Sequence, residues 1–343
     1  MSKKINFKPK QVTKKILSPL QDRSLDIVKS RFGLGTEKDR KTLEAIGDKY
    51  GITRERVRQI EQAALALIKK SEEYKSEKTT WDELKGLVDE LGGIVAEDEL
   101  LSSLAKDDET QNHIHFYLVL GDEFVKHRED DNFVSRWSVD TDLSDKVHGS
   151  LDSLYETLTD DELISEGDMV NRFLDELKKI NIDHRDQEIA KRWLWLSKKI
   201  QKNPLGEWGS SEASGVKARG IKDYAYLMMR KHGSPMHFRE VAEAITDTFA
   251  KKCHTATCHN ELIKDNRFVL VGRGMYALKE WGYKPGVVRD VIREILKREG
   301  PLTKEEVVDK VLKERYLKKN TILVNLQNPK YFKKNKEKKY APV

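Results

Sequence analysis

The sequence has little of what marks a secreted or membrane-spanning protein. It contains two cysteines in 343 residues, which excludes a framework of disulfide bonds. No apolar run approaches the ~18 residues of a membrane-spanning helix, and the opening Met-Ser-Lys-Lys-Ile-Asn-Phe-Lys lacks the apolar core of a signal peptide. Only 38% of the residues are hydrophobic, which favours several small domains over one large core. We therefore expect a cytoplasmic protein of several modules with no membrane partner.

Positive charge is scarce in the middle of the chain and concentrated at its ends. The net charge of +6 divides into +9 for residues 1–78, −11 for 79–140, −6 for 141–215 and +14 for 216–343. Basic segments attract polyanions and acidic segments are repelled by them. Both ends are therefore predicted nucleic-acid surfaces, and the acidic middle is predicted to act as a spacer or to contact protein.

Residues 18–75 have the pattern of a small helical module. A first helix is predicted to begin at Ser18, with proline at its first helical position, and to end near Gly33. A second helix opens at Thr42 and stops at Gly51, and a third opens at Thr53. Two helices joined by so tight a turn are typical of a helix-turn-helix whose last helix faces outward.

The third predicted helix carries side chains that suit DNA. Arginine pairs with guanine, glutamate accepts from the cytosine amino group, and glutamine binds adenine through two hydrogen bonds. The base-edge candidates on its exposed face are Arg54, Glu55, Arg58 and Gln59. Thr53, Arg56 and a basic N-terminal arm of residues 1–17 suit phosphates. The alternative is a generic three-helix domain whose arginines are merely solvated.

This stretch closely resembles region 4 of sigma-70-type transcription initiation factors. The resemblance rests on Thr42-Leu-Glu-Ala-Ile-Gly, on Gly51-Ile-Thr-Arg-Glu-Arg-Val-Arg-Gln-Ile-Glu and on Arg31-Phe-Gly-Leu before them. In that family the outward helix reads the promoter −35 element, and the module docks on the flap of the RNA polymerase β subunit. The resemblance implies double-stranded DNA as a partner, RNA polymerase core as another, and base contacts by the four candidates. We find no counterpart of the sigma segments that recognise and melt the −10 element, so a complete sigma factor is not expected.

The rest of the chain repeats one pattern. Four segments each show an amphipathic helix, a break, two further helices and a hairpin, and they span 79–140, 142–212, 217–283 and 284–343. Aromatic residues eight positions apart bracket the last two hairpins, at Phe268 and Tyr276 and at Phe332 and Tyr340. Three helices closed by a two-stranded wing form a winged helix. The predicted fold is therefore mainly α with small β wings, a helix-turn-helix followed by tandem winged-helix domains.

The third repeat resembles the HARE-type winged helix. The likeness lies in Met236-His-Phe-Arg-Glu-Val-Ala-Glu-Ala-Ile and in the run from Asn266 to Trp281. That family includes the N-terminal domain of the RNA polymerase delta subunit and domains attached to restriction enzymes and chromatin proteins. Predicted DNA contacts in this repeat are Thr255, Thr257, His259 and Asn260 on its third helix and Arg273 near its wing.

The wing of the fourth repeat is a run of lysines. This charge suits phosphates or a minor groove, although a basic tail could also serve solubility alone. The predicted contacts are Lys333, Lys334, Lys336, Lys338 and Lys339.

Catalytic and metal chemistry find little support in the sequence. Cys253, His254, Cys258 and His259 crowd into one predicted helix, whereas structural zinc is usually held by two separated ligand pairs. Glu83-Leu-Lys85 has the spacing of a nuclease motif but lies on an amphipathic helix instead of a strand. We expect no cofactor, no metal and no enzymatic activity.

Three functions remain open from the sequence. The leading hypothesis is a bacterial, nucleoid-associated transcription regulator or initiation-factor-like protein that reads a −35-like element. The second is an RNA polymerase accessory protein resembling delta, which would act through protein contacts and charge. The third is the DNA-binding component of a restriction or defence system, and only the HARE-type resemblance supports it.

Overall fold

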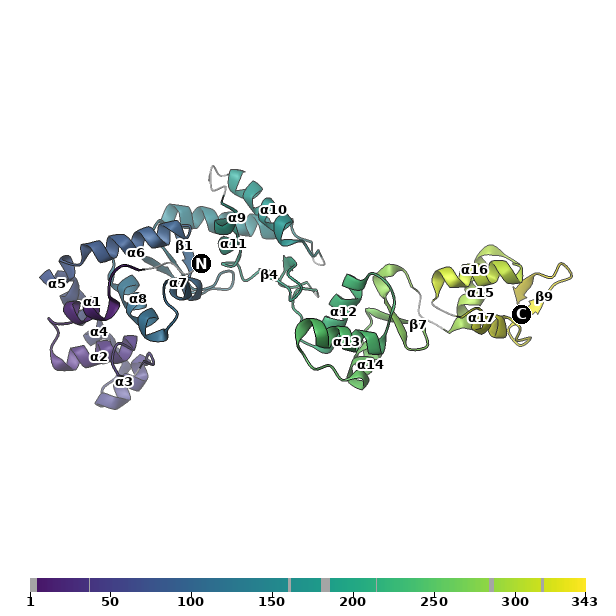
Figure 1. Ribbon diagram of the computed structural model, residues 1–343, viewed down its shortest axis with the longest axis horizontal. Helices are drawn as coiled ribbons and strands as arrows, with labels where there is room; N and C mark the ends of the chain where they lie inside the picture. Colours follow the sequence, from purple (N-terminus) through teal and green to yellow (C-terminus); the bar gives the residue numbers. More distant parts are fainter. Residues whose placement is uncertain are drawn as a thin grey trace. The chain divides into compact units, whose positions relative to one another are not determined.

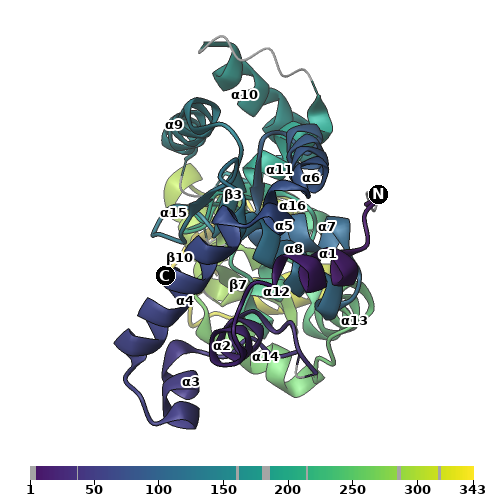
Figure 2. The same cartoon turned by 90° about the vertical axis from the view of Figure 1, so that its left-hand side faces the viewer.

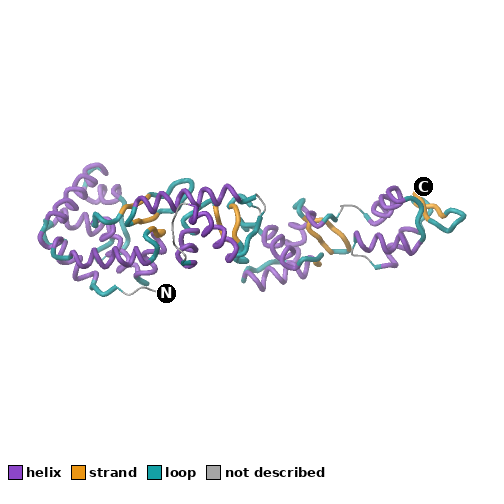
Figure 3. The backbone as a smooth tube through the Cα atoms, turned by 90° about the horizontal axis from the view of Figure 1, so that it is seen from above, coloured by secondary structure: helices purple, strands orange, loops and turns teal. Residues whose placement is uncertain are grey.

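The structure is a computed structural model that describes residues 5–36, 38–159, 162–179, 186–213, 215–283, 287–315 and 318–343. The chain divides into two compact units, Met1–Gln201 with Trp208–Ser211 and Lys202–Glu207 with Glu212–Val343. Helices form most of each unit, and strands are confined to small antiparallel sheets (Figures 1 and 3). Among the described residues, every helix is too short or too polar to cross a lipid bilayer.

The first unit begins with the predicted helix-turn-helix. Its helices are α1 (Pro9–Ile16), α2 (Asp22–Phe32), α3 (Leu43–Tyr50), α4 (Arg54–Lys70) and the short α5 (Glu72–Lys75). The turn between α3 and α4 depends on two glycines. A Cβ on Gly47 would lie 2.6 Å from the Ile52 carbonyl oxygen, so a side chain there would force α3 away from the turn. Gly51 ends α3 with φ of 63°, a conformation that favours glycine.

The start of the first predicted helix is wrong. Residues 18–20 form a turn, and α2 begins at Asp22. An additional helix, α1, lies within the predicted basic arm, of which residues 1–4 fall outside the described part. Val12, Ile16, Leu17 and Leu20 are all buried in the core of the unit. Burial of these apolar side chains outweighs the local capping signal at Ser18.

The first repeat is a winged helix with a three-stranded sheet. It contains α6 (Lys78–Glu90), β1 (Ile94–Ala96), α7 (Glu97–Leu104), α8 (Asp108–Leu120), β2 (Val125–His127) and β3 (Arg136–Ser138). The strand order is β1-β3-β2, and both pairings are antiparallel.

The second repeat has the same helix order and a two-stranded wing. Its elements are α9 (Thr141–Thr157), α10 (Glu166–Lys179), α11 (Gln187–Leu194), β4 (Ile200–Lys202) and β5 (Trp208–Ser210). Ile164 forms an isolated bridge with Trp208 before α10, in the place that β1 holds in the first repeat. Asp160 and Asp161, part of the predicted acidic surface, lie outside the described residues.

The second unit holds the last two repeats. The third contains α12 (Ile221–His232), β6 (Met236–His237), α13 (Phe238–Phe249), α14 (Thr255–Lys264), β7 (Phe268–Gly272), β8 (Met275–Leu278) and η1 (Lys279–Trp281). The fourth contains α15 (Val288–Glu299), α16 (Lys304–Glu314), α17 (Lys319–Leu326), β9 (Phe332–Lys334) and β10 (Tyr340–Pro342). Both hairpins pair as predicted, and the fold class of a helix-turn-helix followed by winged helices is confirmed.

One hydrophobic core joins the helix-turn-helix to the first winged helix. Apolar side chains of α1, α2 and α4 pack with those of α6, α7 and α8 in a single cluster, and Figure 2 shows α1 and α2 beside α8. The hydroxyl of Thr13 in α1 lies 2.8 Å from His113 Nδ1 and 2.7 Å from the hydroxyl of Tyr117, both in α8. The segments 18–75 and 79–140, predicted as separate modules, thus share their buried surface.

Candidate nucleic-acid interface

The first turns of α4 present a row of polar side chains to solvent. Thr53 caps the helix, and its hydroxyl accepts a hydrogen bond of 3.2 Å from the backbone N–H of Arg56. Val57 points the other way and is fully buried with Ile27 and Ile46. Because Val57 is buried, the predicted base-edge side chains lie together on the exposed face of α4. They are Arg54, Glu55, Arg58 and Gln59.

Hydrogen bonds order this row before any ligand is present. Arg58 donates to both carboxylate oxygens of Glu55, from Nη2 at 2.6 Å and from Nε at 2.9 Å. Gln59 Nε2 lies 3.5 Å from the same carboxylate, and Arg56 Nη1 donates to Gln59 Oε1 at 3.1 Å. The hydrogen bond from Arg58 lowers the pKa of the Glu55 carboxyl, which favours its ionised form. Glu55 and Arg58 therefore face solvent as a bidentate pair, while Arg54 forms no ion pair with any described residue.

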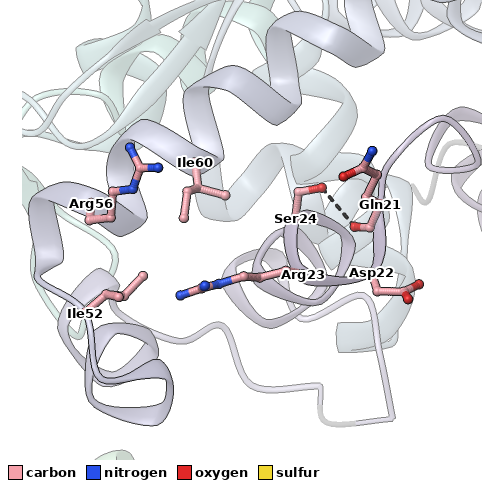
Figure 4. A pocket seen from close by; sticks show the side chains of 7 residues that line it. All are labelled: Gln21, Asp22, Arg23, Ser24, Ile52, Arg56 and Ile60. Carbon is pink, nitrogen blue, oxygen red and sulfur yellow. Dashed lines mark hydrogen bonds between the residues drawn. The ribbon is translucent and has the colours of Figure 1, made fainter.

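A groove beside α4 adds an arginine that the sequence analysis missed. The groove has a volume of about 710 Å³ and lies between the start of α2 and the turn before α4. Figure 4 shows Arg23 reaching from α2 toward α4, with Ile52 and Ile60 on the opposite side. Arg56, a predicted phosphate contact, lines the same groove. Once α2 is known to start at Asp22, Arg23 falls in its exposed first turn, and the misplaced helix start concealed this.

The N-terminal lysines do not all remain available for phosphates. Lys10 forms an ion pair with Glu109 at 2.6 Å, and Lys15 pairs with Glu77 at 2.6 Å. Both acceptors belong to segments that share the core with α1. Part of the basic charge predicted for a free arm therefore serves to attach α1 to its own unit.

The two acidic winged helices use their third helices for packing. In α8, most residues from Asn112 to Leu120 are buried, because α1 and α2 cover the helix. Asn112 donates to the carbonyl oxygens of Gly33 and Lys38, and it accepts from Arg40 Nε at 2.6 Å. The third helix of the second repeat, α11, packs on β1, and Arg192 pairs with Glu99 at 2.9 Å. α8 is therefore not free to enter a DNA groove, and α11 has one face engaged in packing.

The third winged helix leaves part of its third helix exposed. Thr255, Thr257 and Asn260 are exposed on α14, and Arg273 is exposed at the tip of the wing between β7 and β8. His259 differs, because its ring stacks on Phe238 with 4.2 Å between ring centroids and is half-buried. The structure thus gives His259 a ring contact, whereas Thr255, Thr257 and Asn260 are exposed.

The fourth winged helix carries its lysines on the wing. Asn335 closes the turn between β9 and β10, since its side-chain oxygen accepts from the Lys339 N–H at 2.8 Å. Lys339 is half-buried, and Lys338 adopts φ of 63° in the turn. Lys334 lies over the ring of Tyr340. The exposed lysines of this wing are Lys333, Lys334, Lys336 and Lys338.

Metal ligation has no geometric support in the part of the chain that the structure describes. There, no three or more histidine, cysteine, aspartate or glutamate side chains are grouped so as to hold an ion. Cys258 is buried in the core of the third winged helix, and burial raises the pKa of its thiol to about 12. Cys253 is half-buried beside it, and burial raises its pKa as well.

These elements define a chain of one helix-turn-helix and several winged helices, and comparison with known proteins agrees. Residues 16–70 match the family model of sigma-70 region 4. Residues 219–281 match the HARE-HTH family model, a helix-turn-helix domain described as that of restriction endonucleases among other proteins. Both are DNA-binding domains and not enzymatic ones, which supports a DNA-binding transcription regulator.

Sigma-factor relatives share the first of these segments. Over 55 residues the chain is 46% identical to the RNA polymerase sigma factor RpoD of Neisseria gonorrhoeae, a stretch that covers 16% of this chain and 8% of that protein. Over 55 residues it is 42% identical to the RNA polymerase principal sigma factor HrdD of Streptomyces griseus, with 16% of each chain covered. The chain therefore spans only a small part of the length of these curated relatives.

Proposed function

We propose that the protein is a sequence-specific transcription regulator that reads a −35-like promoter element through α4. The observation that carries this proposal is the exposed row of Arg54, Glu55, Arg58 and Gln59, held outward by the buried Val57. Such side chains discriminate bases by about 1–3 kcal/mol for each good bidentate contact. The similarity to two sigma factors over this segment supports the same assignment.

The Glu55–Arg58 pair provides a mechanism by which α4 recognises bases. Because each partner orients the other, the pair enters a major groove as a preorganised donor and acceptor set. Arg58 then donates to a purine edge, and Glu55 accepts from a cytosine amino group. Arg23 and Arg56, in the neighbouring groove, hold the adjacent phosphates and set the register of the helix on the duplex.

A contact with RNA polymerase core, through the flap of its β subunit, is the second part of the proposal. The similarity to two RNA polymerase sigma factors supports it. Much of the apolar surface of α1, α2 and α4 is already buried against α6, α7 and α8. The polymerase would therefore meet a surface such as the later turns of α4, where Leu67 is 48% exposed.

The DNA-reading proposal is tested by selecting preferred duplexes from a random library with the full chain. Binding of the selected and of a scrambled duplex is then compared for Glu55→Ala and Arg58→Ala. We expect the preference for the selected duplex to fall by about 1–3 kcal/mol in each variant. Arg172→Ala is the matched control, because it removes an exposed arginine that pairs with Glu162 in an acidic module. Unchanged preference in both α4 variants would count decisively against the proposal.

The polymerase proposal is tested by purifying the tagged chain from its native cells with and without nuclease. Core subunits that persist after nuclease treatment support a direct contact, whereas their loss shows that DNA alone bridged the two. Persistence together with wild-type DNA preference in Glu55→Ala would favour the delta-like accessory function instead. The net charges of −11 and −6 in the middle modules, whose third helices take part in packing, favour that second candidate.

A further inference from the structure

We infer that one chain binds two separate duplex segments at once, so that the protein bridges DNA. The inference rests on the proposed function, because it takes α4 as the first DNA surface. The second surface lies in the other unit and consists of the wing of the fourth winged helix with the start of α17. The observations that carry the inference are the basic surfaces of the two units and the acidic surface of the chain between them.

The first surface is small and directional. It comprises the exposed start of α4, with Arg54 unpaired among the described residues, and the groove lined by Arg23 and Arg56. Its area is limited because α8 covers the other side of the helix-turn-helix. A surface of this size holds one turn of a duplex and reads it through one helix.

The second surface is basic and less specific. Lys333 and Lys336 are exposed on the wing and form no ion pair with any described residue. Lys318 and Lys319 at the start of α17 are exposed in the same winged helix. Lysines of this kind contact phosphates as point charges, so they bind a duplex with little regard to sequence. Residues 216–343 carry a net charge of +14, which is the largest among the four segments into which the charge was divided.

The chain between the two surfaces repels a duplex. Residues 79–140 and 141–215 carry net charges of −11 and −6. Several of their carboxylates are exposed and form no ion pair within the described ranges, and these are Asp82, Asp98, Asp108, Glu123, Asp131, Asp145 and Glu156. Of the third helices that could have entered a groove, α8 is buried under α1 and α2, and α11 has an exposed glutamate, Glu188, in its first turn.

This charge pattern decides how DNA can be bound. A duplex held at α4 cannot continue along the acidic modules, because phosphates and carboxylates within a Debye length of about 8 Å repel each other. The second unit is a separate compact unit with its own basic surface, and we expect it to take up its own segment of duplex. That segment comes from a distant part of the same DNA molecule or from another molecule.

The test is a sandwich capture with the full chain. A biotinylated duplex that contains the selected α4 sequence is fixed on beads, the protein is added, and a fluorescent duplex of unrelated sequence follows. We expect the wild-type chain to retain the fluorescent duplex. Lys333→Glu with Lys336→Glu should reduce that retention at least tenfold while binding to the beads is unchanged. Lys297→Glu with Lys313→Glu changes the net charge of the same winged helix equally, on α15 and α16, and should retain the second duplex.

The outcomes separate this inference from the proposed function. If the wild-type chain binds either duplex alone but never both, bridging is wrong and the proposed reading by α4 stands. If the chain ignores the selected sequence, the proposed function fails first. Mass photometry of the captured complexes counts the chains, and we expect one chain with two duplexes. Complexes that always contain two chains would overturn the inference, because self-association would then explain the bridge.

Discussion

At the scale of single residues, charge partners distinguish arginines that can bind DNA from those that hold the fold. Arg58 is oriented by Glu55, and Arg40 is tied to Asn112 through its Nε. Arg23 and Arg54 have no carboxylate partner among the described residues and remain exposed. Residue type alone does not reveal this difference, because it depends on which acidic side chain the fold brings near.

Arg23→Ala should weaken binding to all duplexes alike. Arg23 lines the groove next to α4, where we propose that it holds a phosphate. Losing one phosphate contact reduces the slope of log K against log salt by about 1. Titrations at several salt concentrations measure it, with Lys75→Ala in α5 as the control that removes an exposed cation of the same unit. A loss confined to the selected sequence would mean that Arg23 reads a base.

A buried histidine should make the first unit sensitive to acid. His115 is packed near Phe32 and Trp137, and burial, helped by the charge of Arg40, lowers its pKa to about 3. In the unfolded chain the imidazole of His115 becomes protonated near pH 6.5, whereas in the folded chain it stays neutral down to about pH 3. The contribution of His115 to the free energy of unfolding therefore falls as the pH drops below about 6.5, by at most about 1.4 kcal/mol per pH unit.

Denaturant titrations between pH 7 and pH 4.5 check this expectation. His115→Gln should reduce the pH dependence without abolishing it, because burial also lowers the pKa of His148 in the same unit to about 4. His254→Gln, which changes an exposed histidine of the other unit, should leave the slope as in the wild type. Equal slopes in all three proteins would show that His115 does not titrate on unfolding.

At the scale of elements, α8 is a packing helix in the position of a recognition helix. Its position in the winged helix is that of a recognition helix, but its side chains hold the helix-turn-helix in place. Asn112 joins α8 to the loop between α2 and α3 through the carbonyls of Gly33 and Lys38, and Glu109 of α8 also pairs with Lys38. The lengths of these hydrogen bonds, 3.2 Å and 2.7 Å, are those of ordinary amide contacts.

Asn112→Ala should loosen this junction. The change removes the side-chain donor to the carbonyls of buried Gly33 and of Lys38, and should lower the free energy of unfolding of the first unit by about 1–3 kcal/mol. Chemical denaturation measures it, and Gln111→Ala, which removes one hydrogen bond to Ala105 within the same winged helix, is the control. Equal stability of the two variants would mean that the loop is held by its apolar contacts.

At the scale of the whole molecule, the unit of folding is larger than the motif. Phe32, Val28 and Ile68 of the helix-turn-helix pack with Trp81 and Phe116 of the first winged helix in one core. A fragment of residues 1–76 would expose this surface to water, at a cost of about 25 cal/mol for each Å² of apolar area. By contrast, the core of the third winged helix is made of its own residues.

Three fragments should therefore behave differently. Residues 1–76 should lack a cooperative thermal transition, whereas 1–211 and 215–283 should each melt in one. Circular dichroism with thermal melting measures this, with binding to the selected duplex as a second readout for 1–211. A cooperative melt of 1–76 would show that the helix-turn-helix is stable without its neighbour.

The sequence alone determined a great deal about this protein. Helix periodicity, the helix start at Thr53 and the hairpin spacing depend on neighbours in the chain, so the helix-turn-helix, the wings and the exposed face of α4 could be predicted. The start of α2, the helix in the basic arm and the role of Arg23 could not be predicted.

Only the tertiary structure decided those points, and it also decided that α8 is buried and that one face of α11 is packed. Each of them depends on apolar or polar contacts between residues up to a hundred positions apart, such as Thr13 with His113. Local patterns report the free energy of a short segment, whereas burial against a distant segment adds several kcal/mol that no window of sequence contains.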